Sequence, residues 1–328
     1  MSSESEGDAE VWLPFRVERH SGAIVSIDGR EADWDQPFYG DTLADLLRRG
    51  ASGRAFLPQE ADRGVVGPEL IVGHCGRCAS TLLARALEIG DRWAMFREPQ
   101  PFNQLLNFLD PATAPGGLPA TVALVASVSA QLAAVARRRG RSYAVKLSSP
   151  STVALGLLAD LWPAAHRVFV HRAAMPVILS QCAAPPDWLV RLEDDQIRAL
   201  ATLPEIDRIR RLVGIEWSPR PLVAGAAWLS AIEAAAAQCG RGGLRTIDYR
   251  SLTGAPAAVV EQVHDLVGRP TATTRAAVGR LANTDVKAAD DLGRVNVDSP
   301  VMRGTVEIAR AVSELAADAL ATVRDASL

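Results

Sequence analysis

The stretch LIVGHCGRCASTLLARALE, residues 70–88, decides the fold class. It opens with a short apolar run, Leu70–Val72, which predicts a buried strand, and it closes with Ser80–Glu88, whose leucines and alanines recur on one helical face. A loop that contains glycine joins the two. Such a loop between a strand and a helix presents backbone N–H groups and the positive end of the helix dipole to an anion. The stretch therefore predicts a strand, an anion-binding loop and a helix.

Strands and helices alternate through the rest of the chain. Further strands are predicted at Tyr143–Lys146, Arg167–His171 and Leu244–Tyr249. Helices are predicted at Ser151–Leu161, from Pro176 through Ser180, and at Leu222–Gln238, Pro256–Val267 and Thr305–Val323. This alternation favours an α/β fold with three layers, in which helices cover both faces of a parallel sheet.

The composition changes at two places, which suggests how the chain is divided. Residues 1–66 hold short apolar and aromatic stretches and one helix-like segment, Thr42–Arg49, and are interpreted as an N-terminal extension or small module. Residues 67–328 form the α/β domain. Within it, residues 185–221 are rich in charge and predict one or two amphipathic helices, either a solvated insertion or a lid over a binding site.

The composition excludes several classes of protein. The 328 residues carry 35 Lys and Arg against 38 Asp and Glu, a net charge of -3, which gives no electrostatic footprint for nucleic acid. The most apolar run, Thr121–Ala136, is too short for a membrane span, and the acidic N-terminus does not resemble a signal peptide. Four cysteines in a chain of this length are not a disulfide framework, so we expect a cytoplasmic protein. Nothing in the sequence predicts an oligomeric state.

Arginine supplies nearly all of the positive charge. The only lysines are Lys146 and Lys287. Any site that binds an anion must therefore rely mostly on arginine, whose planar fork binds phosphate and sulfate through two parallel hydrogen bonds.

The loop after the first strand has the residue types of an anion site, and it also contains a pair of cysteines. Arg77 adds a cation, and Ser80 and Thr81 add hydroxyl donors, although no Gly-Lys-Ser/Thr of a nucleotide triphosphatase is present. Cys75 and Cys78 have the spacing of a redox pair. Cysteines in such a loop are more often simply small, buried residues. A zinc site would need two further ligands at suitable spacing.

Several segments together resemble the sulfotransferase family, whose sulfonate donor is 3′-phosphoadenosine 5′-phosphosulfate. Gly76–Leu83 resembles the family's 5′-phosphosulfate loop, and Phe96–Pro99 is similar to a Glu-Pro element of bacterial members. Tyr143–Pro150 resembles the strand that carries a lysine before a turn with proline. The best match is Leu157–Ser180, LLADLWPAAHRVFVHRAAMPVILS, and Leu244–Leu252 resembles a later strand and helix. The resemblance implies a P-loop NTPase-like three-layer fold.

The resemblance also implies roles for individual residues. The loop residues that would hold the 5′-phosphosulfate are Gly76, Arg77, Cys78, Ala79, Ser80 and Thr81. Arg172 and Ser180, eight residues apart, would hold the 3′-phosphate. Arg77 would also neutralise the bridging oxygen, and Glu98 would act as the general base. The acceptor would be a hydroxyl or amine of a small molecule or saccharide, and this chemistry is expected to need no metal.

Some positions depart from the family pattern, and other functions stay open. Gly76, Cys78 and Ala79 stand where the family usually has Pro, Ser and Gly, so a non-catalytic binding protein with this fold is one alternative. A second alternative is a P-loop kinase of a small metabolite, in which Asp248 would hold Mg²⁺, and a third is a thiol redox protein. His74 and His171 compete with Glu98 as bases, and Lys146 is either a crevice residue or a surface lysine.

Overall fold

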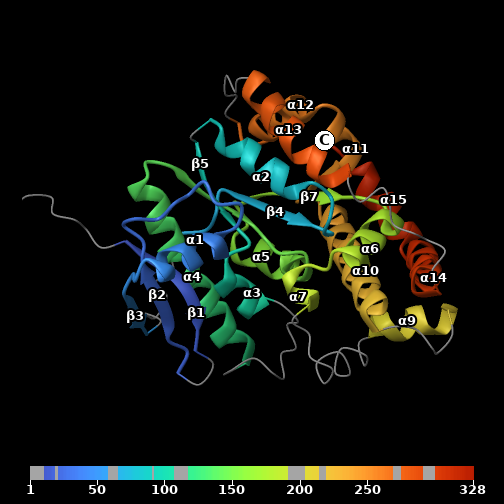
Figure 1. Cartoon of the computed structure of the whole chain (residues 1–328), viewed down its shortest axis with the longest axis horizontal. Coiled ribbons are helices and arrows are strands. Elements are labelled where there is room, and N and C mark those ends of the chain that lie inside the picture. Colours follow the sequence, from blue (N-terminus) through green and yellow to red (C-terminus); the bar gives the residue numbers. More distant parts are fainter. Residues whose placement is uncertain are drawn as a thin grey trace, which may run out of the picture.

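A five-stranded parallel sheet forms the centre of the molecule, as Figure 1 shows in the computed structural model. The structure describes residues 11–18, 21–57, 66–90, 92–106, 117–190, 204–213, 219–268, 275–290 and 300–328. The strands of the sheet are β4 (Leu70–His74), β5 (Trp93–Arg97), β6 (Ser142–Lys146), β7 (His166–His171) and β8 (Arg245–Asp248). Their order is β5-β6-β4-β7-β8, and every neighbouring pair is parallel. The predicted α/β fold with a parallel sheet is confirmed.

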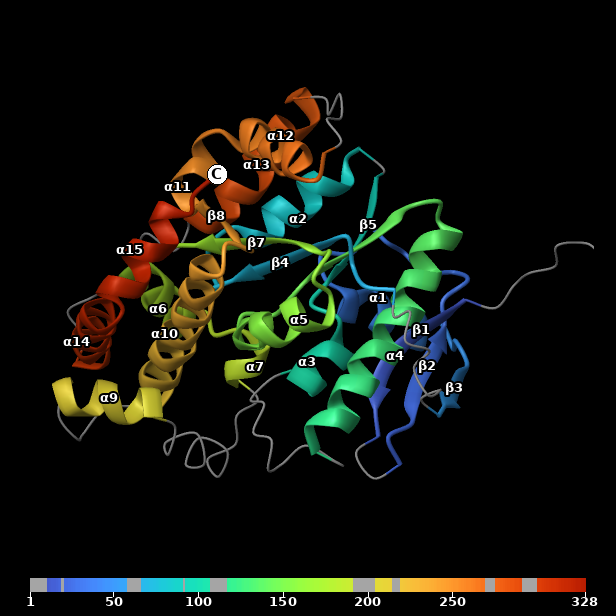
Figure 2. The same ribbon diagram turned by 180° about the vertical axis from the view of Figure 1, so that it is seen from behind.

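Helices lie on both faces of this sheet. The elements that follow β4 and β5 are α2 (Ser80–Glu88), α3 (Gln100–Leu106) and α4 (Gly117–Arg138), and those around β7 are η1 (Pro150–Ala154), α5 (Leu155–Leu161), α6 (Ala174–Ala183) and α7 (Asp187–Val190). The later helices are α9 (Pro204–Val213), α10 (Pro219–Gly240), α11 (Tyr249–Gly254), α12 (Pro256–Leu266), α13 (Arg275–Asp290), α14 (Pro300–Leu315) and α15 (Ala317–Asp325). In Figures 1 and 2, α2, α12 and α13 lie on one side of the sheet, and α5, α6 and α10 lie on the other.

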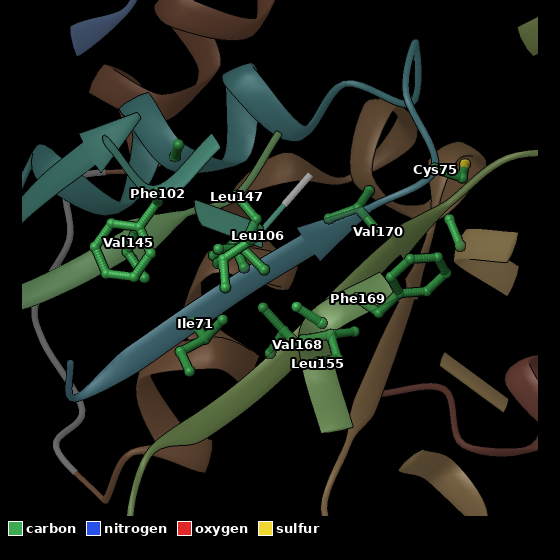
Figure 3. Close-up of a cluster of buried hydrophobic side chains, with 14 of the residues drawn as sticks. Ile71, Cys75, Phe102, Leu106, Val145, Leu147, Leu155, Val168, Phe169 and Val170 are labelled. Atoms are coloured by element: carbon green, nitrogen blue, oxygen red, sulfur yellow. The ribbon is translucent and has the colours of Figure 1, made fainter. Parts of the chain in front are cut away.

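The core forms where apolar strands meet these helices. All five residues of β4 and all five of β5 are buried, as expected for strands covered on both faces. Figure 3 shows Ile71, Val145 and Val168 of three adjacent strands gathered with Phe102 of α3 and Leu155 of α5. This dry core fixes the carboxyl ends of the strands relative to one another.

The N-terminal segment forms a second, antiparallel sheet. Its strands β1 (Trp12–Val17), β2 (Ile24–Asp28) and β3 (Gly53–Phe56) pair in chain order, and α1 (Tyr39–Arg48) lies between β2 and β3 in the sequence. Helix α4 packs against β1 of this sheet and against β5 and β6 of the parallel sheet. We refer to residues 11–57 as the N-terminal module. Whether the chain divides at residue 66 stays a prediction.

Two predicted helices differ in detail from the structure. The predicted terminal helix Thr305–Val323 was wrong as a single element, because the chain turns at Ala316 (φ -95°, ψ 6°) between α14 and α15. This turn lets α15 return to β8, where the Thr246 hydroxyl donates to the Val323 carbonyl at 2.6 Å. Pro176 is the third residue of α6 rather than the first, but it still lies in the first turn, where its missing N–H leaves no intrahelical bond unmade.

Among the residues that the structure describes, two helices have the length and hydropathy of a membrane span. They are Leu118–Arg138 and Pro219–Gly240, and 50% and 61% of their apolar windows are buried inside the fold. Core helices of soluble proteins satisfy the same criterion, so this finding is weak evidence for a membrane span. The predicted absence of a span therefore stays a prediction.

Candidate active site

The loop between β4 and α2 has an unusual backbone. Gly76, Arg77 and Ala79 all have positive φ, at 83°, 46° and 63°. A residue other than glycine in this region costs about 1–3 kcal/mol and persists only where its surroundings impose it. Such turns bring successive backbone N–H groups to one side of the chain, where they can bind an anion. Strain of this kind is concentrated at binding sites, which fits the predicted role of the loop.

A pocket of about 410 Å³ lies over this loop. It brings together every residue that the sequence assigned to the site: Gly76, Arg77, Cys78, Ala79, Ser80, Thr81, Glu98, Arg172 and Ser180. These residues come from the carboxyl ends of β4, β5 and β7 and from the helices that follow, where ligands bind in open parallel sheets. The predicted residues therefore share one cavity, although they span more than a hundred positions of the sequence.

Gly76 explains one departure from the family pattern. Proline fixes φ near −65°, whereas Gly76 has φ 83°, so the loop as it is built here could not accept the usual proline. A Cβ at this position would also lie 2.5 Å from Nε2 of Gln181. The backbone therefore favours glycine at this position, and a larger residue would also have to displace the end of the Gln181 side chain.

Arg77 and Arg172 are linked across the loop. Arg172 donates from its guanidinium to the backbone carbonyl of Arg77 at 3.1 Å, and its guanidinium carbon lies 4.0 Å from the centre of the Tyr249 ring. The Arg77 guanidinium donates to the carbonyl of Ala184, at the end of α6. Both cations line the pocket, and Arg172 is held from two sides.

Ser180 has an unmet hydrogen-bonding requirement. Its side chain is buried, and its Oγ has no partner among the described residues. A buried hydroxyl without a partner costs about 1–3 kcal/mol, so a partner from a ligand would recover that free energy. Ser180 and Arg172 line the same pocket, and together they supply a hydroxyl and a guanidinium, which are donors that suit a phosphate group.

Glu98 lies at the end of β5 in an ion pair with Lys146. The Glu98 Oε1 contacts Nζ of Lys146, which is fully buried, and Nε2 of His74 lies 3.6 Å from the same oxygen. Burial acts to raise the pKa of Glu98, but Lys146 and His74 outweigh it and lower the pKa to about 2. Glu98 is therefore ionised at neutral pH, and Lys146 is a crevice residue rather than a surface lysine.

The two alternative bases occupy different settings. His74 lines the pocket, but its Nδ1 accepts the N–H of Gly76 at 3.0 Å and its Nε2 contacts the carbonyl of Leu147 at 2.9 Å. Both ring nitrogens thus hold the loop in place. His171 faces a separate cavity, where its Nδ1 lies 3.7 Å from Asp248, and burial lowers its pKa. The role of Glu98 as the base stays a prediction.

The cysteine pair is buried in the loop. Cys75 and Cys78 are free thiols, 1% and 0% exposed. Cys78 donates from Sγ to the carbonyl of Val170 at 3.3 Å, and burial raises the pKa of Cys75 well above its usual value. Burial acts to raise the pKa of Cys78 as well, but Cys75, His74 and Lys146 outweigh it and lower that pKa well below its usual value. Redox cysteines need an accessible thiolate, and neither thiol is exposed, so this setting favours a packing role.

The metal-dependent alternative gains no support from Asp248. This residue lies outside the pocket and caps α11, because its Oδ1 accepts the N–H of Arg250 at 2.7 Å. Among the residues that the structure describes, no group of three or more His, Cys, Asp or Glu could hold a metal ion.

Sequence reasoning missed the apolar side of the pocket. Pro37 and Phe38 of the N-terminal module line it, as do Pro186 and Trp188 near α7. No motif marks these residues, because long-range packing alone brings them to the site. Residues 191–203 and 214–218 of the predicted lid lie outside the described residues, so the structure describes only residues 185–190, helix α9 and residues 219–221 of it.

Comparisons with known proteins return solved sulfotransferase structures. The match to a sulfotransferase from Mycobacterium avium is 14% identical, covers 86% of this chain and 82% of that one, and has a TM-score of 0.47. A sulfotransferase domain of the Synechococcus olefin synthase is 16% identical over 77% of this chain and 96% of that one, with a TM-score of 0.41. The sulfotransferase domain from the curacin biosynthetic pathway is 16% identical over 76% and 98%, with a TM-score of 0.40.

No protein-family model and no curated protein matches the sequence. The matching structures carry the name of the family that the sequence resembles. Since their identities and TM-scores are low, the function proposed below rests on the residues of this chain.

Proposed function

We propose that the protein is a sulfotransferase, which moves a sulfonate from 3′-phosphoadenosine 5′-phosphosulfate to a hydroxyl or amine of a small molecule or saccharide. The observation that carries this proposal is the shared pocket. It combines the strained loop, the Arg172–Ser180 pair and the Lys146–Glu98 pair at one edge of the sheet.

The binding residues divide according to the two charged ends of the donor. The loop amides with Ser80 and Thr81 hold the 5′-phosphosulfate, at the positive end of α2. Arg172 and Ser180 hold the 3′-phosphate, which distinguishes this donor from ATP. Arg77 neutralises the charge that grows on the bridging oxygen as the sulfonate leaves.

Glu98 takes the proton of the acceptor. Its carboxylate is ionised, but a pKa of about 2 makes it a weak base while Lys146 is paired with it. The donor brings negative charge into the pocket, and this charge competes with Glu98 for Lys146. Any loosening of the pair raises the pKa of Glu98 toward its ordinary value and strengthens it as a base.

Substitution of Glu98 tests this proposal. Glu98→Gln keeps the shape of the side chain but removes the base, so we expect single-turnover transfer of labelled sulfonate to fall by about 10²–10⁴-fold. Affinity for 3′-phosphoadenosine 5′-phosphate, measured by calorimetry, should not fall by more than about threefold, since the base acts on the acceptor and its removal frees Lys146 for the anion. Wild-type turnover in this variant would move the role of base to another residue. A wild-type protein that binds the bisphosphate but transfers no sulfonate would be a non-catalytic binding protein.

A further inference from the structure

The N-terminal module supplies one wall of the pocket, and this wall contains none of the residues that the proposed function assigns to the donor. Phe38 lines the pocket, and the centre of its ring lies 5.7 Å from Nζ of Lys146. Lys146 in turn contacts Glu98, the proposed base. Because a base must lie beside the group that it deprotonates, Phe38 borders the place where the acceptor binds.

The module is held firmly in this position. Arg97, the residue before Glu98, is buried, and its guanidinium donates to the carbonyl of Trp34 at 3.0 Å and to that of Gln36. It also forms an ion pair with Glu88 at 2.6 Å. The position of Phe38 is therefore tied through Arg97 to the strand that carries the base.

Aromatic packing secures the same contact. The rings of Trp34 and Tyr39 meet Phe96 of β5 edge to face, with centroids 5.9 and 5.8 Å apart. Phe38 lies between these two anchors in the sequence, yet it is 38% exposed. When a ligand covers such an exposed apolar side chain, the binding free energy becomes more favourable by about 25 cal/mol for each Å² of apolar surface removed from water.

The charges beside Phe38 include one neutralised pair. Lys146 and Glu98 neutralise each other, the proposed function assigns Arg77 and Arg172 to the donor, and Arg85 of α2 also lines the pocket. An acceptor with a carboxylate or sulfate would place its charge near Glu98, and a protonated amine lacks the lone pair that attacks sulfur. The remaining wall adds Pro37, Pro186 and Trp188, which are apolar surfaces that an acceptor can pack against.

We infer that Phe38 of the N-terminal module is a specificity-determining residue, and that the acceptor is a neutral alcohol or phenol with an apolar body rather than a saccharide or an anion. This inference rests on the proposed function. The acceptor hydroxyl forms the new O–S bond, the bond from sulfur to the donor's bridging oxygen breaks, and the hydroxyl proton passes to Glu98.

The test compares acceptors of similar size and different chemistry. Naphthol represents the apolar class, para-hydroxybenzoate the anionic class and N-acetylglucosamine the saccharides. We expect transfer to naphthol with a kcat/KM at least about tenfold above that of the other two. Phe38→Ala should raise the KM for naphthol about tenfold or more with kcat within about threefold, because the contact is made equally before and during the reaction. Leu47→Ala is the control, since Leu47 is an exposed apolar residue of α1 outside the pocket.

A second readout separates this inference from the proposed function. The fluorescence of naphthol reports its binding to the complex of the protein with 3′-phosphoadenosine 5′-phosphate, whether or not transfer occurs. Weaker naphthol binding in Phe38→Ala, with unchanged bisphosphate binding, supports the role of Phe38 whether or not sulfonate is transferred. A failure to sulfate any acceptor would count against the proposed function alone. A higher kcat/KM for the saccharide or the anion than for naphthol overturns the inference about the acceptor. So does unchanged naphthol affinity in Phe38→Ala, or a loss of bisphosphate affinity in that variant.

Discussion

Lys146 and Glu98 form an ion pair inside the pocket. Burial disfavours the charge on each side chain, and the opposite charge of the partner stabilises it. Lys146 is fully buried, while a quarter of the Glu98 side chain is exposed. The Glu98 pKa of about 2 lies below its value in the unfolded chain, so ionisation of Glu98 stabilises the fold above about pH 4.5. That stability is lost as the pH falls through the folded pKa of about 2.

Lys146→Met should reverse this dependence. Without Lys146, only His74 still lowers the pKa of Glu98. We expect burial to outweigh His74 and raise the pKa of Glu98, so that the protein becomes less stable as the pH rises. We expect the free energy of unfolding to fall by about 3 kcal/mol near pH 7 and by less near pH 4. The value near pH 7 is the lower end of the cost of breaking a buried ion pair, because Glu98 is partly exposed. Urea denaturation at both pH values measures this. Lys146→Met with Glu98→Gln should recover most of the loss, and a loss independent of pH would mean that the pair is not ionic.

The positive φ of Gly76 gives a prediction about the loop backbone. Gly76→Ala should cost about 1–2 kcal/mol of stability and should also weaken bisphosphate binding, because the new Cβ disturbs Gln181 in the pocket. Gly140→Ala is the matched control, since Gly140 also has positive φ, at 64°, but has no atom within 4 Å of the new Cβ. Thermal unfolding and calorimetry should show similar losses of stability, with binding weakened only in Gly76→Ala. Equal bisphosphate affinity in the two variants would remove the loop from the donor site.

At the scale of elements, local sequence patterns predicted the central parts of the site. The helix Ser80–Glu88 has the predicted bounds, because its apolar residues recur on one face and a glycine-bearing loop marks its start. The strand His166–His171 and the helix that carries Ser180 were also predicted, since β-branched and aromatic residues precede a proline in the first helical turn. These elements depend on neighbours in the sequence, which a pattern can capture.

Other elements depend on contacts that no local pattern encodes. The turn at Ala316 has neither glycine nor proline and exists because α15 packs beside β8. The positive φ of Ala79 and Glu98 reflects imposed strain, which residue type does not predict. Glu98 pairs with Lys146, which lies 48 positions further along the chain, and Phe38 lies near the same lysine from still further away in the sequence. These contacts follow from the order of the strands in the sheet rather than from any motif.

The β4–α2 loop also tests the role of the cysteines. Because both thiols are buried, we expect Cys75→Ala and Cys78→Ser, singly and together, to keep sulfonate transfer within about threefold of wild type. Serine at position 78 retains a donor for the carbonyl of Val170. Transfer rates and circular dichroism on the same preparations measure activity and folding. Folded single variants that both lose activity would support a redox role instead.

At the scale of the whole molecule, the sheet order explains why the site lies where it does. Strand β4 is central, with β6 on one side and β7 on the other, and its carboxyl end leads into the strained loop. Glu98, Lys146 and Arg172 follow or end neighbouring parallel strands, so their side chains reach the same edge. The N-terminal module then adds the wall that holds Phe38. The site is thus assembled from separate parts of the chain by one sheet and one added module.

Calorimetry with three ligands tests whether the pocket holds a nucleotide with both a 5′ and a 3′ anionic group. We expect 3′-phosphoadenosine 5′-phosphate to bind without Mg²⁺ and more tightly than ADP with Mg²⁺. Arg172→Ala should weaken this binding by about 2–4 kcal/mol, roughly 30- to 1,000-fold. The same variant should weaken adenosine 5′-phosphosulfate, which lacks the 3′-phosphate, far less. Tighter binding of ADP with Mg²⁺, or equal losses of affinity for 3′-phosphoadenosine 5′-phosphate and adenosine 5′-phosphosulfate in Arg172→Ala, would show that the pocket does not recognise a 3′-phosphate through Arg172.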